Sequence, residues 1–212
     1  MEIVNIEEKA FLGIFLASVE AFPTRFRPNQ YRRPNGTNPE GEVHGLLFGQ
    51  RIISQKGATT FNVTLSVPNQ IVHERNADGI MPSVVHIDRI REVTEMFPGY
   101  QYLGSFHSHP ERRGDFHKKK TVDFSEADNR SALGSADDQG EGLLEVIFGL
   151  TCLERRARTQ PEHIGTHIIH NCCGVYKYSL ACFIAEPDGN NLVDADNLIC
   201  TSASGMHFVD FE

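Results

Sequence analysis

The order of the apolar segments constrains this fold more than any other feature of the sequence. Six runs have the length and pattern of strands: residues 42–50, 60–67, 102–109, 143–153, 166–172 and 174–185. Two helices are also predicted: 8–22 precedes the first of these strands, and 83–97 lies between the second and the third. Because strands and helices mix without strict β-α-β alternation, we expect an α+β (mixed α/β) fold with a mixed sheet, rather than a Rossmann-type fold.

Apolar spacing supports both helices and one of the strands. The first helix should present the stripe Phe11, Phe15, Val19 and Phe22, broadened by Leu12 and Leu16, and end at Pro23. The second should be capped by Ser83, precede Pro98 and present Val84, Ile87, Ile90, Val93 and Phe97. Strict alternation in 60–67 predicts one buried strand face made of Phe61, Val63, Leu65 and Val67.

Length and charge narrow the class of protein. The chain has 212 residues, 40% of them hydrophobic, and a net charge of -8, which fits one domain with its own core. The acidic balance argues against nucleic-acid or anionic-membrane partners. No apolar run reaches the length of a membrane span, and the acidic start (MEIVNIEEKAFL) is unlike a signal peptide. We therefore expect a cytoplasmic protein.

The five cysteines do not predict a disulfide framework. Their number is odd, they form no C-x-x-C pair, and no secretory signal precedes them. We expect small buried hydrophobic side chains at Cys152, Cys172, Cys173, Cys182 and Cys200.

The run from 104 to 110 (GSFHSHP) carries the strongest chemical signal. Residues two apart on a strand point to the same side, so His107 and His109 can present two imidazoles to one point. A catalytic zinc takes three protein ligands and keeps a position for water, and Asp128 could supply the third ligand. Each part has another interpretation: an H-x-H pair can be merely hydrogen-bonded, and Ser125-x-x-Asp128 matches a helix capping box.

Taken together, these residues resemble the JAMM metallopeptidase motif of the MPN (JAB) domain family, in its prokaryotic type. The family pattern is a Glu on an early strand, then H-[ST]-H-P, then S-x-x-D at the start of a helix. Glu42 begins EVHGLLFG, residues 107–110 are HSHP, and residues 125–128 are SEAD. The resemblance implies a JAB/MPN-like domain over 1–185, with a central mixed or curved sheet flanked by helices, and a C-terminal extension over 186–212.

Two segments depart from the family pattern as insertions. Residues 23–41 are rich in proline, carry Arg25, Arg27, Arg32 and Arg33, and predict an extended loop. Residues 111–124 (ERRGDFHKKKTVDF) are about twice as long as the family's usual spacing. This length leaves Asp115 and Asp123 open as alternative ligands, whereas we expect His117 to be solvated. Both segments carry basic side chains that could meet an acidic partner.

The resemblance also implies a mechanism. His107, His109 and Asp128 would hold Zn²⁺ with one activated water, and Glu42 would take the proton of that water and deliver it to the leaving amine. Ser125 would donate to the oxyanion. Ser108 faces the other side of the strand and should have a structural role.

Family resemblance implies a hydrolase that cuts an amide or isopeptide bond at the C-terminal tail of a ubiquitin-like or sulfur-carrier-like protein. Two alternatives stay open: a non-catalytic MPN scaffold, or a hydrolase of a different small amide. In the C-terminal extension, 198–200 and 208–209 could dock on the body or on another subunit. The sequence does not indicate the oligomeric state.

Overall fold

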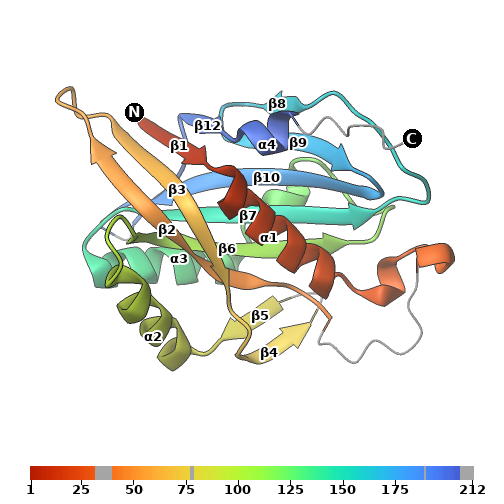
Figure 1. Cartoon of the computed structure of the whole chain (residues 1–212), viewed down its shortest axis with the longest axis horizontal. Coiled ribbons are helices and arrows are strands. Elements are labelled where there is room, and N and C mark those ends of the chain that lie inside the picture. The colour runs from red at the N-terminus through yellow and green to blue at the C-terminus, as the bar shows by residue number, and fades with distance from the viewer. Residues whose placement is uncertain (32–39, 77–78, 189, 206–212) are drawn as a thin grey trace.

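The computed structural model describes residues 1–31, 40–76, 79–188 and 190–205. Figure 1 shows a curled sheet with helices on both faces. The helices are α1 (Glu8–Ala21), α2 (Val84–Glu95), α3 (Glu126–Gln139) and α4 (Thr201–Gly205), with 3-10 turns η1 (Thr24–Phe26), η2 (Asn29–Tyr31) and η3 (Lys120–Val122). The strands are β1 (Glu2–Ile6), β2 (His44–Ile53), β3 (Thr59–Pro68), β4 (Val72–Asn76), β5 (Gly79–Pro82), β6 (Gln101–Glu111), β7 (Leu143–Cys152), β8 (Glu162–Ile164), β9 (Ile168–Cys173), β10 (Tyr176–Ala185), β11 (Leu192–Asp194) and β12 (Asn197–Ile199).

The main sheet is mixed, which confirms the α+β prediction. Its order is β12-β1-β3-β2-β6-β7-β10-β9-β8, and β11 pairs with β10. The pairs β1–β12, β1–β3 and β6–β7 are parallel, whereas β2 pairs antiparallel with both β3 and β6. A separate hairpin of β4 and β5 leads into α2. All six predicted strands and both predicted helices are present, with ends shifted by a few residues.

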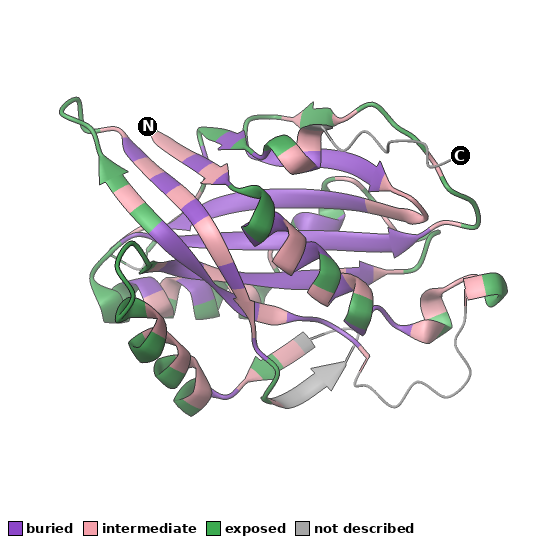
Figure 2. Ribbon diagram, viewed as in Figure 1, coloured by how far each residue is buried: buried purple, intermediate pink, exposed green. Residues whose placement is uncertain are grey.

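One face of the sheet packs against α1 and holds the main hydrophobic core. In Figure 2 the middle of the sheet is continuously buried beneath α1. Phe11 and Phe15 of α1 meet Phe148 of β7 and Tyr178 of β10, with ring centroids 5.7 to 6.2 Å apart. The rings of Phe148 and Tyr178 are themselves 5.3 Å apart. Leu16 does not broaden this stripe as predicted: it is 59% exposed, because at 100° per residue it lies about 140° around the helix from Phe11, whereas Ile14 lies only about 60° from Phe11. Ile14 is buried in its place.

The prediction of one buried face along residues 60–67 is wrong beyond Val63, because β3 contains a bulge. Phe61 and Val63 are buried, as expected, but Leu65 and Val67 are only partly buried and Ser66 is buried instead. The pairing with β2 shifts between Phe48 and Gly49. Because an extra residue in one strand reverses which side chains face the core, strict alternation in the sequence did not continue as one buried face.

Helix α2 forms as predicted, but its apolar side chains pack much less against the body of the protein than the sequence predicts. None of its residues is buried, and Val84, Val93 and Phe97 are 55% to 67% exposed. Ser83 occupies the N-cap position, but its hydroxyl group makes no cap hydrogen bond; it contacts Nδ1 of His86 at 2.8 Å.

The described part of the C-terminal extension contributes to the main sheet. β11 pairs with β10, and β12 pairs with β1, next to the N-terminus. Leu198 and Cys200 are 1% exposed, so residues 198–200 dock on the body of this chain. Residues 208–209 lie outside the described residues, as do Arg32 and Arg33 of the first insertion.

Two composition-based expectations can also be compared with the fold. All five cysteines are free, four are buried and Cys173 is partly buried, as expected for small hydrophobic side chains. No helix in the described ranges is long and apolar enough to cross a membrane.

Candidate metal centre

Strand β6 presents the two histidines on the face opposite α1. Ser105, His107 and His109 share this face, since they are two residues apart. Phe106, between two of them, is fully buried in the core beneath α1. His107 is 7% exposed and pairs in register with His44 of β2. The strand therefore directs both imidazoles to the same side, as the H-x-H spacing predicted.

Asp128 reaches the histidines because of how α3 begins. Ser125 is the N-cap of this helix, and its Oγ accepts a hydrogen bond from the Asp128 backbone N–H at 3.1 Å. The Ser125 backbone N–H donates to Asp128 Oδ2 at 3.0 Å, which completes a capping box. The two sequence interpretations of this segment are therefore compatible: the capping box itself orients the carboxylate toward β6.

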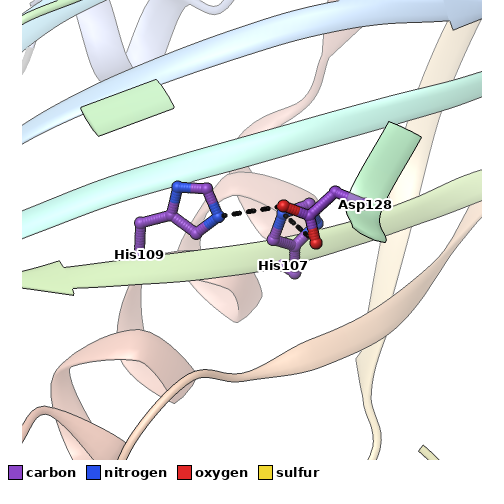
Figure 3. Close-up of side chains that lie close together, drawn as sticks. All are labelled: His107, His109 and Asp128. Carbon is purple, nitrogen blue, oxygen red and sulfur yellow. Dashed lines mark ion pairs between the residues drawn. The ribbon is translucent and has the colours of Figure 1, made fainter. Parts of the chain in front are cut away.

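The three side chains converge on one point (Figure 3). Asp128 Oδ1 lies 3.7 Å from His107 Nε2, and Oδ2 lies 3.8 Å from His109 Nε2. The ligand atoms of this trio all lie within 4.8 Å of one another. Two ligands about 2.1 Å from a tetrahedral zinc are roughly 3.4 Å apart. Small side-chain adjustments thus bring these atoms to coordination distance, and the trio could hold a metal ion.

The surroundings of His107 Nε2 also suit a bound metal ion. This atom is buried and has no hydrogen-bond partner, since 3.7 Å from Asp128 is too long for a hydrogen bond. Buried polar atoms without a partner are rare and call for an explanation. A metal ion between the two side chains would satisfy both the nitrogen and the carboxylate.

The second insertion holds His109 in the orientation that a metal ligand needs. His109 Nδ1 lies 2.8 Å from the carbonyl oxygen of Thr121 in η3. As the carbonyl can only accept, Nδ1 carries the proton and Nε2 keeps its lone pair toward Asp128. Thr121 is buried against β7. A Cβ atom on Gly149 would lie 2.6 Å from its side chain, so glycine permits this approach.

The charges within the trio are strongly coupled. Burial alone would lower the pKa of His107, but the Asp128 carboxylate, with Glu42 and Glu145, raises it above the ordinary value. Burial and the neighbouring His107 lower the pKa of His109 to about 4. Burial opposes ionisation of Asp128, yet His107 and the Ser125 hydrogen bonds lower its pKa far below normal. The shifts thus favour an ionised Asp128 and a neutral His109, and they make His107 the imidazole of the pair that holds a proton more readily. A metal ion would compete with that proton for the nitrogen.

Glu42 lies just outside the trio. It is 7% exposed and precedes the first residue of β2 by two positions, so it lies before the strand rather than on it. Its charge contributes to the raised pKa of His107. Ser108 positions the adjoining backbone: its Oγ accepts from the Val43 N–H at 2.9 Å, and its own N–H donates to the Val43 carbonyl at 2.8 Å.

The alternative ligands lie outside the cluster. Among the described residues, the potential metal-binding group at this site consists of His107, His109 and Asp128, without Asp115 or Asp123. His117 makes local contacts instead: its backbone N–H donates to Thr121 Oγ1, and its Nδ1 accepts from the Lys120 N–H. The long spacing before Ser125 is therefore compatible with the expected geometry.

Sequence reasoning missed a buried carboxylic acid next to the trio. Glu145 of β7 is 4% exposed and pairs in register with Ser105, whose hydroxyl donates to Glu145 Oε2 at 2.7 Å. Burial raises the pKa of Glu145 to about 7, despite the Ser105 hydrogen bond. A signal was present in the sequence, because one glutamate interrupts the apolar run LLEVIFGL (143–150).

A cavity of about 420 Å³ adjoins the trio. His107 and Asp128 form part of its wall, together with Ser105, Glu145 and His44. Burial, reinforced by the charge of His107, lowers the pKa of His44 to about 3, so this imidazole is neutral. Helices α2 and α3 contribute the other side of the cavity. A substrate in this cavity would have direct access to the candidate metal ligands.

Comparisons with known proteins assign no family to this chain. No family model matches it, and no curated protein matches it. Among solved structures, it is similar to the N-terminal domain of STIL from Trichoplax adhaerens, with a TM-score of 0.41 and 11% sequence identity. The match covers 86% of this chain and 42% of that one, so the chain spans less than half the length of this structure. A likeness this distant says nothing about activity.

Proposed function

We propose that this chain is a zinc-dependent hydrolase of the JAMM type, which cuts an amide or isopeptide bond at the C-terminal tail of a ubiquitin-like or sulfur-carrier-like protein. One observation carries the proposal: His107 and His109 of β6 and Asp128 of α3 bring their ligand atoms within 4.8 Å of one another. The curled mixed sheet with helices on both faces is compatible with the MPN/JAB fold that the motif implies.

Zinc is the metal that the donor set fits best. Two imidazole nitrogens and one carboxylate oxygen are typical ligands of catalytic zinc, with one position left for water. Bound there, zinc would supply Lewis acidity and lower the pKa of a water molecule toward about 7.

The other residues have roles that follow from their positions. Glu42, buried beside His107, would take a proton from the attacking water and pass it to the leaving amine. The Ser125 hydroxyl, whose oxygen already accepts from the Asp128 N–H, keeps its own proton to donate to the carbonyl oxygen of the scissile bond. Thr121 and Ser108 act as positioning residues, for His109 and for the backbone next to Glu42 respectively.

Hydrolysis of a fusion between a ubiquitin-like protein and a reporter tests this proposal. The zinc-loaded chain should release the reporter, and Glu42→Gln should abolish release while retaining zinc. Glu40→Gln provides a matched control, because it makes the same change two residues earlier and should leave release unchanged. Retained zinc without hydrolysis of any amide, in the wild type, would contradict a catalytic role.

The same assay addresses the two other candidate functions. A non-catalytic scaffold would bind a ubiquitin-like protein without cutting it, whether or not Glu42 is replaced. A hydrolase of another small amide would cut model amides in a Glu42-dependent manner but leave every ubiquitin-like fusion intact. The adjoining cavity favours catalysis over scaffolding, since a scaffold needs no cavity beside a metal centre.

A further inference from the structure

We propose that the cavity beside the metal centre is a specificity pocket for a basic side chain, an ammonium or guanidinium group of the substrate, with Glu145 as the residue that pairs with its charge. The inference rests on the proposed function in one respect: it takes the basic ligand to be part of the substrate that is cleaved. The pocket itself can be tested in the absence of metal.

The position of Glu145 is the first argument. Glu145 lines the cavity although only 4% of the residue is exposed. The Ser105 hydroxyl donates a hydrogen bond to the Glu145 carboxyl group at 2.7 Å. A buried carboxylate is costly unless a cation or several donors satisfy it. A basic ligand would add a cation to the one hydroxyl donor and offset this cost.

The balance of charges in the wall of the cavity also favours a positively charged ligand. Apart from His107 and Asp128, whose charges face each other at 3.7 Å, three carboxylates line it: Asp88, Asp138 and Glu145. Arg91 contributes one positive charge, but its guanidinium group lies 4.1 Å over the Tyr102 ring and donates to Gln139 Oε1 at 2.7 Å. Outside the His107–Asp128 pair, the three carboxylates therefore outnumber Arg91, and its guanidinium group is already engaged.

The walls of the cavity suit the stem of a basic side chain. Leu46, Ile80 and Leu143 line it together with the polar groups. Lysine and arginine bury their aliphatic stems against apolar surface while the charged end keeps a polar partner. A volume of about 420 Å³ lies within the range of ligand pockets and exceeds what one such side chain needs. Apolar walls with a carboxylate among them thus match this ligand in both shape and charge.

Two small probes of nearly the same shape test the pocket. Butylguanidinium is always charged, whereas butylurea is its neutral counterpart, and neither is a strong zinc ligand. Each is titrated at pH 8 into the full-length chain, first without metal and then with zinc, and followed by the ¹⁵N–¹H NMR shifts of β6 and β7. We expect butylguanidinium to bind at least about tenfold more tightly than butylurea, as a charge-assisted hydrogen bond implies.

Variants then assign the preference to Glu145. Glu145→Gln keeps the shape and should remove the preference, by weakening butylguanidinium about tenfold and leaving butylurea unchanged. Asp138→Asn, at an exposed position on the cavity wall, should weaken butylguanidinium binding about twofold. If Glu145→Gln does not fold, this variant tests whether the acidic groups of the cavity bind the cation. Asp137→Asn removes the same charge from the neighbouring exposed position, outside the lining residues, and should change nothing.

The outcomes separate this inference from the proposed function. Equal binding of the two probes, or a preference that survives Glu145→Gln, would overturn the basic-side-chain pocket even if zinc binds and amides are cut. A Glu145-dependent preference in the metal-free chain would support the pocket even if the chain proved to hydrolyse nothing.

Discussion

The two faces of strands β6 and β7 are built from alternate residues of the same segments, yet they differ in almost every property. Toward α1, Phe106, Val146 and Phe148 are fully buried among aromatic and aliphatic side chains. Toward α3, Ser105, His107 and Glu145 line a cavity. Ser105 donates a hydrogen bond to Glu145, and the pKa values of His107 and Glu145 are raised. A shift of one residue in strand register would exchange the two sets.

This difference shows how one sheet can serve stability and chemistry separately. The face beneath α1 is closely packed, with rings in contact from three elements. The opposite face tolerates an unpartnered nitrogen on His107 and a buried carboxyl group on Glu145, both of which cost free energy. We therefore expect substitutions on the first face to lower stability and those on the second to change binding and pH dependence.

The largest loss of stability should come from the packed face. Phe148→Ala removes a fully buried ring and should lower the free energy of unfolding by about 3–5 kcal/mol, because the surrounding rings cannot close the cavity. Urea unfolding measures the change. Leu16→Ala on α1, where the side chain is 59% exposed, should change stability by less than about 0.5 kcal/mol. Similar losses for the two variants would contradict the packing described for this face.

On the opposite face, Glu145→Gln should stabilise the metal-free chain at high pH. Burial raises the pKa of Glu145 from 4.5 to about 7. Between these values the unfolded chain ionises and the folded chain does not, so wild-type stability falls as pH rises. The variant lacks this loss and should be more stable than the wild type at pH 8 by on the order of 3 kcal/mol. At pH 4 the two should be equal.

Urea unfolding of the zinc-free proteins at both pH values checks this sign. A gain of the same size at pH 4 and pH 8 would show that the effect does not come from ionisation of Glu145.

The smallest effect concerns the cap that orients Asp128. Ser125→Ala removes the oxygen that accepts from the Asp128 N–H and should cost about 1 kcal/mol of stability. It should also weaken metal binding, since the capping box holds the carboxylate toward β6. Ser131→Ala, exposed on the same helix, serves as the control and should leave both quantities nearly unchanged. Isothermal titration with zinc and thermal unfolding measure the two effects.

Much of the fold follows from local patterns that the sequence displays. The helix at 8–22 and the strand at 102–109 form because their apolar spacing matches one secondary structure. Two details could not be predicted: the bulge in β3, which moves Leu65 off the buried face, and the exposure of α2. Both depend on how elements pair and pack in three dimensions, which periodicity does not encode.

The candidate site was predictable to the extent that short spacings determine geometry. The H-x-H spacing places His107 and His109 on one side of a strand, and the S-x-x-D spacing predicts the cap at Ser125. The prediction that Asp128 joins the histidines came from the resemblance to the JAMM motif, because no short spacing links the two segments. The contact of His109 with the Thr121 carbonyl could not be, because any residue type supplies a carbonyl oxygen. Glu145 was accessible in principle, as a charged residue within a buried strand, but its pairing with Ser105 depends on the parallel register of β6 and β7.

Zinc content of the purified chain tests the central claim most directly. Wild type and two variants, Asp128→Ala and Asp123→Ala, are supplied with zinc, dialysed and measured by elemental analysis, with circular dichroism to verify folding. We predict about one zinc per chain, lost in Asp128→Ala and retained in Asp123→Ala, because Asp128 alone of the two lies with the histidines. A folded wild type that binds no zinc, or an Asp128→Ala variant that keeps it, would contradict this account.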